Sequence, residues 1–287
     1  MVLAIVGPTG VGKTKMSIEL AKYYNAIIIN VDAMQIYKNM NIGTAKITED
    51  EKEGIKHYLF DRCSLDEEYS VYDYQQEARK LINENSDKNI ILVGGTGLYL
   101  KALLYDYKFN EPSDDNFDDL TNEELYNLVK EKDPNSDIHI NNRRRLISYL
   151  SIPKTKNSNK KIIDSIIIGL TTDRDNLYSI INNRVDKMID NGLLEEAKDL
   201  YMKFPNSRAL NTAIGYKELN RYFNHEISLE EAINLIKLNS RHYAKRQYTF
   251  FNNQFDIKWF DTNYNDFSKT VNQVKKYVDN ELSNIKK

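Results

Sequence analysis

Four short apolar runs stand out along the chain. Val2–Val6, Ala26–Val31, Ile90–Val93 and Ile162–Leu170 are mainly aliphatic, which is typical of parallel strands that are buried on both faces. The stretches between these runs carry apolar residues at helical spacing, as from Lys15 to Tyr24. Because strands and helices alternate, the pattern predicts an α/β fold in which helices cover both faces of a parallel sheet.

The pattern changes between residues 110 and 159. This stretch begins acidic, shows helical spacing from Asn122 to Lys130, and ends in a basic run and a Lys-, Asn- and Ser-rich link. We interpret residues 110–159 as a small helical insertion domain and residues 1–109 with 160–287 as the core domain. From Asp173 onward the sequence predicts helices almost to its end, with one strand candidate at Ile257–Phe260.

Composition narrows the class of protein. The 287 residues carry a net charge of −2, so a nucleic-acid site must be a local patch of positive charge. The single cysteine, Cys63, excludes an internal disulfide and a multi-cysteine metal site, and the four histidines are too scattered for zinc. No apolar run approaches the roughly 20 residues that span a bilayer. With a strand in place of a signal peptide at the start, we expect a cytoplasmic protein that does not act at a membrane.

The segment from Gly7 to Thr14 reads Gly-Pro-Thr-Gly-Val-Gly-Lys-Thr, which is the pattern of a phosphate-binding P-loop. It follows the first predicted strand and precedes the first predicted helix, as a P-loop must. Glycines let backbone N–H groups turn inward, and the helix N-terminus adds partial positive charge. Lys13 is placed to reach terminal phosphates and the Thr14 hydroxyl to hold Mg²⁺.

A second glycine-rich segment follows the strand Ile90–Val93. P-loop enzymes that cleave a nucleotide usually carry an aspartate at this strand end, but this chain has Gly94-Gly95-Thr96-Gly97. One interpretation is a broad anion site into which Thr96 projects its hydroxyl. The alternative is a tight strand–helix turn that needs glycine for packing alone.

Asp32 follows the strand Ala26–Val31 and should lie at the same carboxyl edge of the sheet. A carboxylate beside a phosphate site repels phosphate unless it binds Mg²⁺ or takes a proton from an attacking group. A base role suits an amine or hydroxyl nucleophile. The structural alternative is that Asp32 is the N-cap of a following helix.

Six motifs occur in order: GPTGVGKT, DAMQIYK, GTAK (43–46), VGGTGLYLKALL (93–104), AIGYKEL (213–219) and RHYAKRQYTF (241–250). In them the chain resembles the tRNA dimethylallyltransferase family over nearly its whole length. The resemblance implies a P-loop NTPase-like three-layer α/β/α fold. It also implies that the P-loop holds dimethylallyl diphosphate with Mg²⁺, and that the prenyl group goes to N6 of the adenosine next to the tRNA anticodon.

The resemblance assigns roles to individual residues. Asp32 matches the general base, Thr96 matches the threonine near the reacting amine, and Lys13 completes the catalytic set. Arg184 is interpreted either as a second cation on the diphosphate or as half of a surface salt bridge. The diphosphate site is expected to comprise Gly7, Thr9, Gly10, Val11, Gly12, Lys13, Thr14 and Arg184, with Thr14 also holding the metal.

The tRNA anticodon stem-loop is the expected macromolecular partner. Gln35 has the donor and acceptor that base reading requires, and the residues after Arg241 form a basic face interleaved with Tyr243 and Tyr248. A solvated helix face would also explain those charges. The expected tRNA-binding residues are Asp32, Ala33, Met34, Gln35, Thr96, Arg144, Arg145, Thr212, Ala213, Ile214, Gly215, Tyr216, Lys217, Arg241, Lys245, Arg246 and Gln247.

The insertion departs from the family pattern. Ser148–Ser151 stand where the family has Arg-Ala-Leu-Glu, and an arginine expected soon after Pro112 is absent, with Asp118 nearby. Arg144 and Arg145 keep basic charge just upstream. We expect these departures to affect the grip on tRNA more than the diphosphate chemistry.

Three alternatives remain open at this point. A small-molecule kinase would use the P-loop, but it would need the missing strand-end aspartate. A prenyltransferase acting on free adenine nucleotides would keep Asp32 without needing the basic face. A non-enzymatic RNA-binding protein would be favoured if Asp32 and Thr96 were replaced, and both are present. We expect the protein to act as a monomer.

Overall fold

The computed structural model describes residues 1–109, 117, 119–151 and 159–285. The chain divides into two compact units, Met1–Leu104 with Ile162–Lys287 and Tyr105–Lys161. The second unit contains the stretch that the sequence predicts as an insertion. Pro112, Asp118 and the acidic residues before Asp118 lie outside the described residues.

The first unit is built on a parallel sheet. Its strands are β1 (Val2–Val6), β2 (Ala26–Asn30), β3 (His57–Tyr58), β4 (Asn89–Val93), β5 (Ile166–Thr171) and β6 (Lys258–Asp261). Their order is β3-β2-β4-β1-β5-β6, and every neighbouring pair runs parallel. The fold class and the central strands predicted from the sequence are confirmed.

One strand boundary was wrong. The strand predicted at Ile162–Leu170 begins only at Ile166. Ile162 and Ile163 instead donate their backbone N–H groups to the carbonyl of Leu104, at 2.8 and 3.2 Å. These hydrogen bonds therefore join Leu104 to the segment that leads into β5. The two-residue strand β3 is too short to give a pattern in the sequence.

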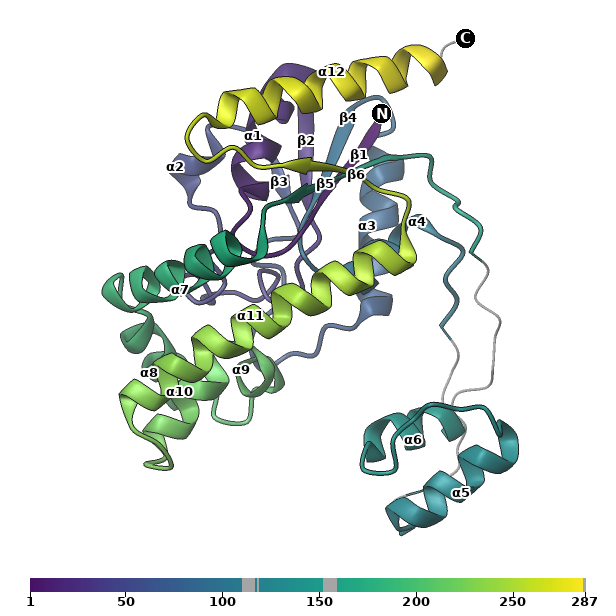
Figure 1. Cartoon of the computed structure of the whole chain (residues 1–287), viewed down its shortest axis with the longest axis vertical. Helices are drawn as coiled ribbons and strands as arrows, with labels where there is room; N and C mark the ends of the chain where they lie inside the picture. The colour runs from purple at the N-terminus through teal and green to yellow at the C-terminus, as the bar shows by residue number, and fades with distance from the viewer. Residues whose placement is uncertain (110–116, 118, 152–158, 286–287) are drawn as a thin grey trace. The chain divides into compact units, whose positions relative to one another are not determined.

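Helices cover both faces of this sheet. The helices of this unit are α1 (Lys13–Tyr24), α2 (Glu49–Lys52), α3 (Val71–Glu84), α4 (Gly97–Leu104), α7 (Arg174–Asp190), α8 (Leu193–Lys203), α9 (Arg208–Thr212), α10 (Tyr216–Phe223), α11 (Leu229–Gln254) and α12 (Phe267–Ile285). Leu3 and Ile5 of β1 share a buried cluster with residues of α1 and α12. Helices α3 and α4 pack together and cover the opposite face (Figure 1).

A second hydrophobic cluster joins α7 through α10 to the first half of α11. Tyr216, Leu219 and Ile236 are almost completely buried in it. The long helix α11 contacts α4, α7 and α10, so it connects this helical lobe to the sheet (Figure 1). The long helical region predicted after Asp173 is confirmed, as is a strand near Ile257–Phe260.

The second unit contains α5 (Asn122–Lys132) and α6 (Arg143–Ser151). Leu125 and Val129 of α5 pack against Leu146 and Leu150 of α6, which gives the unit its own small core. Thr121 begins α5 with a capping box, so the predicted helix starts at the expected residue.

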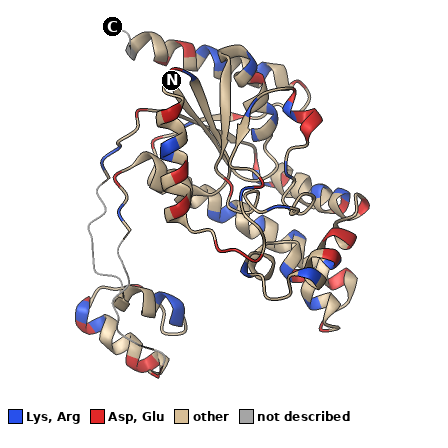
Figure 2. Ribbon diagram, turned by 180° about the vertical axis from the view of Figure 1, so that it is seen from behind, with Lys and Arg blue, Asp and Glu red and all other residues tan. Residues whose placement is uncertain are grey.

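Charge is spread over the surface. Figure 2 shows Lys and Arg interspersed with Asp and Glu along the outer helices. None of the helices in the described part of the chain is long and apolar enough to cross a bilayer. Any site for a polyanion must therefore come from local geometry, which the carboxyl edge of the sheet supplies.

Candidate functional site

Three neighbouring strand ends build the site. The ends of β2, β4 and β1 deliver Asp32, the Gly94–Gly97 segment and the P-loop to one edge of the sheet, where α/β proteins bind ligands. A cavity of about 870 Å³ lies there. The predicted site residues that line it are Thr9, Gly10, Gly12, Lys13, Thr14, Asp32, Ala33, Met34, Gln35, Thr96, Arg184, Thr212, Ala213, Ile214, Gly215, Lys217, Arg246 and Gln247.

The P-loop has the backbone that its glycines require. Gly10 and Gly12 have φ angles of +90° and +89°, a region that side chains with a Cβ disfavour. The Lys13 ammonium bends back over the loop and donates to the carbonyl of Pro8 at 2.7 Å. Thr14, in the first turn of α1, is exposed to the cavity. The loop therefore presents a cation and a hydroxyl at a helix N-terminus.

Lys13 and Arg184 form a pair of partly buried cations. The Arg184 Nη1 donates to the hydroxyl of Thr9 at 2.8 Å, so the surface salt bridge considered for Arg184 is wrong. Burial lowers the pKa of Lys13 to about 7, with the Arg184 charge adding to the shift and the Asp32 carboxylate opposing it. Burial likewise lowers the pKa of Arg184. A bound polyanion would reduce the repulsion between these two cations.

Asp32 lies in the turn that follows β2. Its Oδ1 accepts the N–H of Met34 at 3.0 Å, and its own N–H donates to Asn30 Oδ1 at 2.9 Å. The residues after Asp32 form turns and not a helix, so the N-cap alternative is wrong. The carboxylate is held by one of its oxygens within a cavity that also holds the two cations.

Thr96 lies beside this turn. Its Oγ1 accepts the N–H of Ala33 at 3.0 Å, which ties the end of β4 to the end of β2. The phenol of Tyr243 on α11 lies beside the side chains of Thr96 and Gln247, and burial raises its pKa. The sequence had offered Tyr243 only as part of a basic face. Its contact with Gln247 could have been predicted from its position four residues before Gln247, on the same side of α11.

The glycines around Thr96 serve close packing. A Cβ on Gly94 would lie 2.2 Å from the backbone of Val31, and one on Gly97 would lie 2.2 Å from the ring of Phe250. A Cβ on Gly95 would lie 2.1 Å from the amide nitrogen of Gln247. The packing alternative therefore accounts for these glycines, while Thr96 itself lines the cavity.

Gln247 connects the two glycine-rich segments. Its Oε1 accepts the N–H of Thr9 at 3.1 Å, and its Nε2 donates to the carbonyl of Gly95 at 3.0 Å. Both amide atoms are used within the protein and the residue is 5% exposed, so Gln247 is not part of an exposed face, and its contact with tRNA stays a prediction. It fixes the distance between the P-loop and the segment that carries Thr96.

Gln35 is held by the loop that contains the GTAK motif. Its Nε2 donates to the carbonyl of Thr44 at 3.0 Å and contacts that of Ala45 at 3.4 Å. This loop is anchored in turn by Glu196 of α8, whose carboxylate accepts the backbone N–H groups of Asn41, Ile42 and Gly43. An acidic residue on a helix gives no motif, so the sequence did not single out Glu196.

Tyr216 does not face the cavity. Its ring is completely buried, and its hydroxyl donates to Glu196 at 2.5 Å. The ring packs so closely on Gly43 that a Cβ there would lie 2.5 Å away. The expected contact of the Tyr216 side chain with tRNA is therefore wrong. The residue instead supports the loop that contains the GTAK motif.

The predicted basic face of α11 divides into two kinds of residue. Lys245 and Arg246 are exposed and line a second cavity of about 330 Å³, and Arg246 also lines the main one. Arg241 donates to Asn182 Oδ1 at 2.6 Å. Tyr248 stacks on Trp259 with ring centroids 4.9 Å apart. Neither Arg241 nor Tyr248 lines these cavities.

The remaining predicted residues lie elsewhere. Gly7 and Val11 belong to the P-loop backbone behind the cavity lining. Arg144 and Arg145 are exposed on α6 of the second unit. Their neighbour Arg143 is engaged within that unit, where its guanidinium donates to the carbonyls of Leu120 and Phe117.

Comparison with known proteins identifies the family. The IPP transferase model matches residues 35–254. The chain is 46% identical to a tRNA dimethylallyltransferase of Anoxybacillus flavithermus, over 97% of this chain and 96% of that protein. It is 44% identical to one of Bacillus anthracis, over 98% and 96%. The chain belongs to the IPP transferase family.

Solved structures of the same family share the fold. The full-length tRNA isopentenylpyrophosphate transferase of Bacillus halodurans is 40% identical, with a TM-score of 0.80 over 99% of this chain and 97% of that one. A eukaryotic dimethylallyltransferase acting on tRNA is 27% identical, with a TM-score of 0.81 over 99% and 79%. Membership of the IPP transferase family overturns the small-molecule kinase alternative.

The donor set fits a magnesium ion that is shared with a phosphate ligand. Among the described residues, no group of three His, Cys, Asp or Glu side chains could hold a metal. Magnesium keeps several waters and binds through few protein oxygens plus phosphate. In this member of the IPP transferase family, the Thr14 hydroxyl at the cavity is a suitable single protein ligand.

Proposed function

We propose that the protein transfers the dimethylallyl group of dimethylallyl diphosphate to N6 of the adenosine next to the tRNA anticodon, and releases diphosphate. The observation that carries this proposal is one cavity with two chemically different parts. Lys13 and Arg184 supply paired cations for a diphosphate, and Asp32 with Thr96 supplies a carboxylate and a hydroxyl for an amine. The names of the relatives support tRNA as the acceptor.

The first part of the chemistry is loss of the diphosphate. As the bond between the allylic carbon and the bridging oxygen breaks, the electron pair stays on the diphosphate. Lys13, Arg184 and the N–H groups of the P-loop stabilise that charge where it develops. When bound, Mg²⁺ would neutralise part of the same charge, with Thr14 as its protein ligand. The allylic carbon meanwhile shares its positive charge over the double bond.

The second part is formation of the N–C bond. The N6 amine of adenine is a weak nucleophile, and it must lose one proton as it bonds to the allylic carbon. Asp32 accepts that proton, because one of its oxygens is fixed by Met34 N–H while the other is left for the substrate. Thr96, held by Ala33 N–H and by Tyr243, positions the amine beside Asp32.

The adenine has to leave the stacked anticodon loop before it can enter the cavity. Gln35 lines the cavity, and its Nε2 donates to the Thr44 carbonyl. We assign to it a hydrogen bond with a base edge. Lys217, Lys245 and Arg246 supply cations for the RNA backbone.

A tRNA substrate and a lone, buried cysteine support action in the cytoplasm.

The test is transfer of labelled dimethylallyl diphosphate, with bulk tRNA, AMP and ATP offered together as acceptors. We expect label in tRNA only. Label in AMP or ATP would replace the proposal with a prenyltransferase acting on free nucleotides. Absence of label from all three, with tRNA still bound, would support the RNA-binding alternative.

A further inference from the structure

The segment between β6 and α12 lies against the P-loop. The Thr262 hydroxyl is buried and donates to the carbonyl of Val11 at 3.0 Å. The Tyr264 hydroxyl reaches the carbonyl of Gly10 at 3.5 Å. Two successive carbonyls of the P-loop thus have their partners in a segment from the other end of the chain.

Phe267, the first residue of α12, completes this contact. A Cβ on Gly12 would lie 2.8 Å from the Phe267 ring, so ring and loop backbone touch. The ammonium of Lys15 stands 4.9 Å from the centre of the same ring, within the range of a cation–π interaction. The ring therefore limits where the loop can move at its junction with α1.

These contacts fix the direction of the N–H groups that bind anions. A peptide group is planar, so its C=O and its N–H point in opposite directions. When Thr262 holds the Val11 carbonyl, the N–H of Gly12 in the same peptide group is turned the other way. When Tyr264 holds the Gly10 carbonyl, the Val11 N–H is turned likewise. Among the described residues, neither N–H has a backbone acceptor. Gly12 lines the cavity, so its N–H is available to a ligand there.

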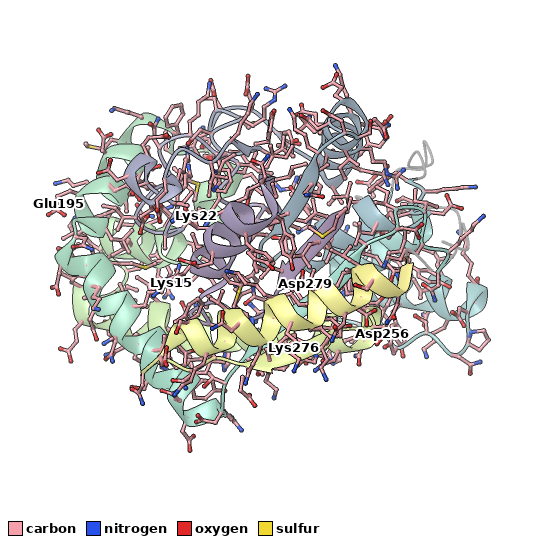
Figure 3. All side chains as sticks on the ribbon, turned by 90° about the horizontal axis from the view of Figure 1, so that it is seen from above. Lys15, Lys22, Glu195, Asp256, Lys276 and Asp279 are labelled. Atoms are coloured by element: carbon pink, nitrogen blue, oxygen red, sulfur yellow. The ribbon has the colours of Figure 1, made fainter. Side chains whose placement is uncertain are left out.

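The segment is itself held in place. The N–H of Asn263 donates to Thr270 Oγ1 in α12 at 2.9 Å. Farther along, Tyr24 of α1 donates to Asp279 of α12 at 2.9 Å. Helices α1 and α12 thus run side by side, with Lys15 near the beginning of α12 and Asp279 farther along it (Figure 3). The P-loop and the segment that touches it are tied to the same helix pair.

We propose that the segment Thr262–Phe267 supports the diphosphate site from outside the cavity, with Thr262 as a positioning residue that aims the Gly12 N–H of the P-loop at the ligand. The inference rests on the proposed function, because it takes a diphosphate as the ligand of the loop. Thr262 does not line the cavity, so it acts through the loop backbone. Both the P-loop and this segment lie outside residues 35–254, the span that the family model matches.

The test compares Thr262→Val with Thr262→Ser. Valine keeps the shape of the side chain and removes the hydroxyl, whereas serine keeps the hydroxyl. Calorimetry measures binding of inorganic diphosphate with Mg²⁺, and steady-state assays measure KM for dimethylallyl diphosphate and for tRNA. We expect Thr262→Val to weaken diphosphate binding about tenfold, to raise KM for dimethylallyl diphosphate in parallel, and to leave KM for tRNA unchanged. Thr262→Ser should stay within twofold of the natural protein.

Tyr24→Phe is the control, because it removes the hydroxyl that joins α1 to Lys275 and Asp279 of α12 but does not touch the P-loop. Unchanged diphosphate binding in Thr262→Val would overturn the inference, and so would equal losses in Thr262→Val and Tyr24→Phe. If Thr262→Val does not fold, Tyr264→Phe takes its place with a smaller loss of the same kind. Natural protein that binds no diphosphate would overturn the proposed function instead.

Discussion

The proposed diphosphate end of the cavity and the outer face of α11 are built in different ways. At the proposed diphosphate end, groups from distant parts of the chain are hydrogen-bonded to each other: Arg184 donates to Thr9, the Thr9 N–H donates to Gln247, and Thr262 donates to the carbonyl of Val11. On α11, Lys245 and Arg246 are exposed. A small anion whose bond must break needs donors in fixed positions. A flexible polyanion such as RNA is attracted by charge that needs no fixed position.

The sharpest test of this contrast is Asp32→Asn. Asparagine keeps an oxygen for the Met34 N–H but cannot take a proton, so we expect kcat to fall about 10²–10⁴-fold. Binding of tRNA and of diphosphate should remain within a few-fold, by filter binding and calorimetry respectively. A parallel large loss of tRNA binding would show that Asp32 serves mainly in recognition.

A second test removes the bridge between the two glycine-rich segments. Gln247→Leu leaves the Thr9 N–H and the Gly95 carbonyl without their partner. Since small displacements of reacting groups are costly, we expect kcat/KM to fall about 10–100-fold, together with a lower melting temperature. Gln254→Leu makes the same change at an exposed position of the same helix and should alter neither quantity. Natural activity in Gln247→Leu would mean that the two segments hold their distance without the bridge.

A third test uses pH. With a pKa of about 7, Lys13 in the free protein is mostly charged at pH 6 and mostly neutral at pH 8. We compare the diphosphate affinity of the natural protein with that of Lys13→Met at each pH. The ratio of the first affinity to the second should fall as pH rises, by up to about tenfold per pH unit above pH 7. Taking this ratio cancels the titration of diphosphate itself. A ratio that is flat from pH 6 to 8 would contradict the shifted pKa.

The same pKa has a consequence for stability. In the unfolded chain Lys13 has the ordinary lysine pKa of 10.5, so between about pH 7 and 10.5 the unfolded state binds more protons than the folded state. The free energy of unfolding should therefore rise with pH across this window, relative to Lys13→Met. Denaturant titrations at pH 7 and pH 9 measure the difference.

The smallest effects should come from α11. Lys245→Ala should weaken tRNA binding a few-fold, lower the salt slope by about one, and leave diphosphate binding unchanged. Lys237→Ala removes the same charge from the same helix, but Lys237 is paired with Asp186 at 2.5 Å, so its effect on the salt slope should be smaller. Equal slopes for Lys245→Ala and the natural protein would mean that this face does not meet the RNA.

Local patterns in the sequence were enough to predict the central strands of the sheet and the P-loop. Val2–Val6 and Ile90–Val93 are apolar because both faces of the strands are covered, and that signal lies within a few residues. The Gly-Lys-Thr spacing of the P-loop likewise indicates phosphate binding from a few neighbouring residues. The sequence could place Asp32 and Thr96 in the same cavity, because the ends of parallel strands meet at one edge of the sheet.

The contacts between distant segments could not be predicted in this way. The amide of Gln247 was grouped with the basic residues beside it because only the fold reveals that this side of the helix is buried. Tyr216 was grouped with its motif for the same reason. Thr262 lies in a polar stretch of ordinary composition, and its role depends on a partner near the opposite end of the chain.

Thr262 and Val11 are separated by 251 residues. Chains are synthesised from the N-terminus at roughly 5–20 residues per second, so on the order of 10–50 s pass between the making of the P-loop and that of its partner. The loop therefore emerges early but gains this hydrogen bond only when nearly the whole core has followed it. An incomplete chain would carry the phosphate-binding motif and yet lack the support that aims it, so the ability to bind diphosphate tightly would appear as a late event in biosynthesis.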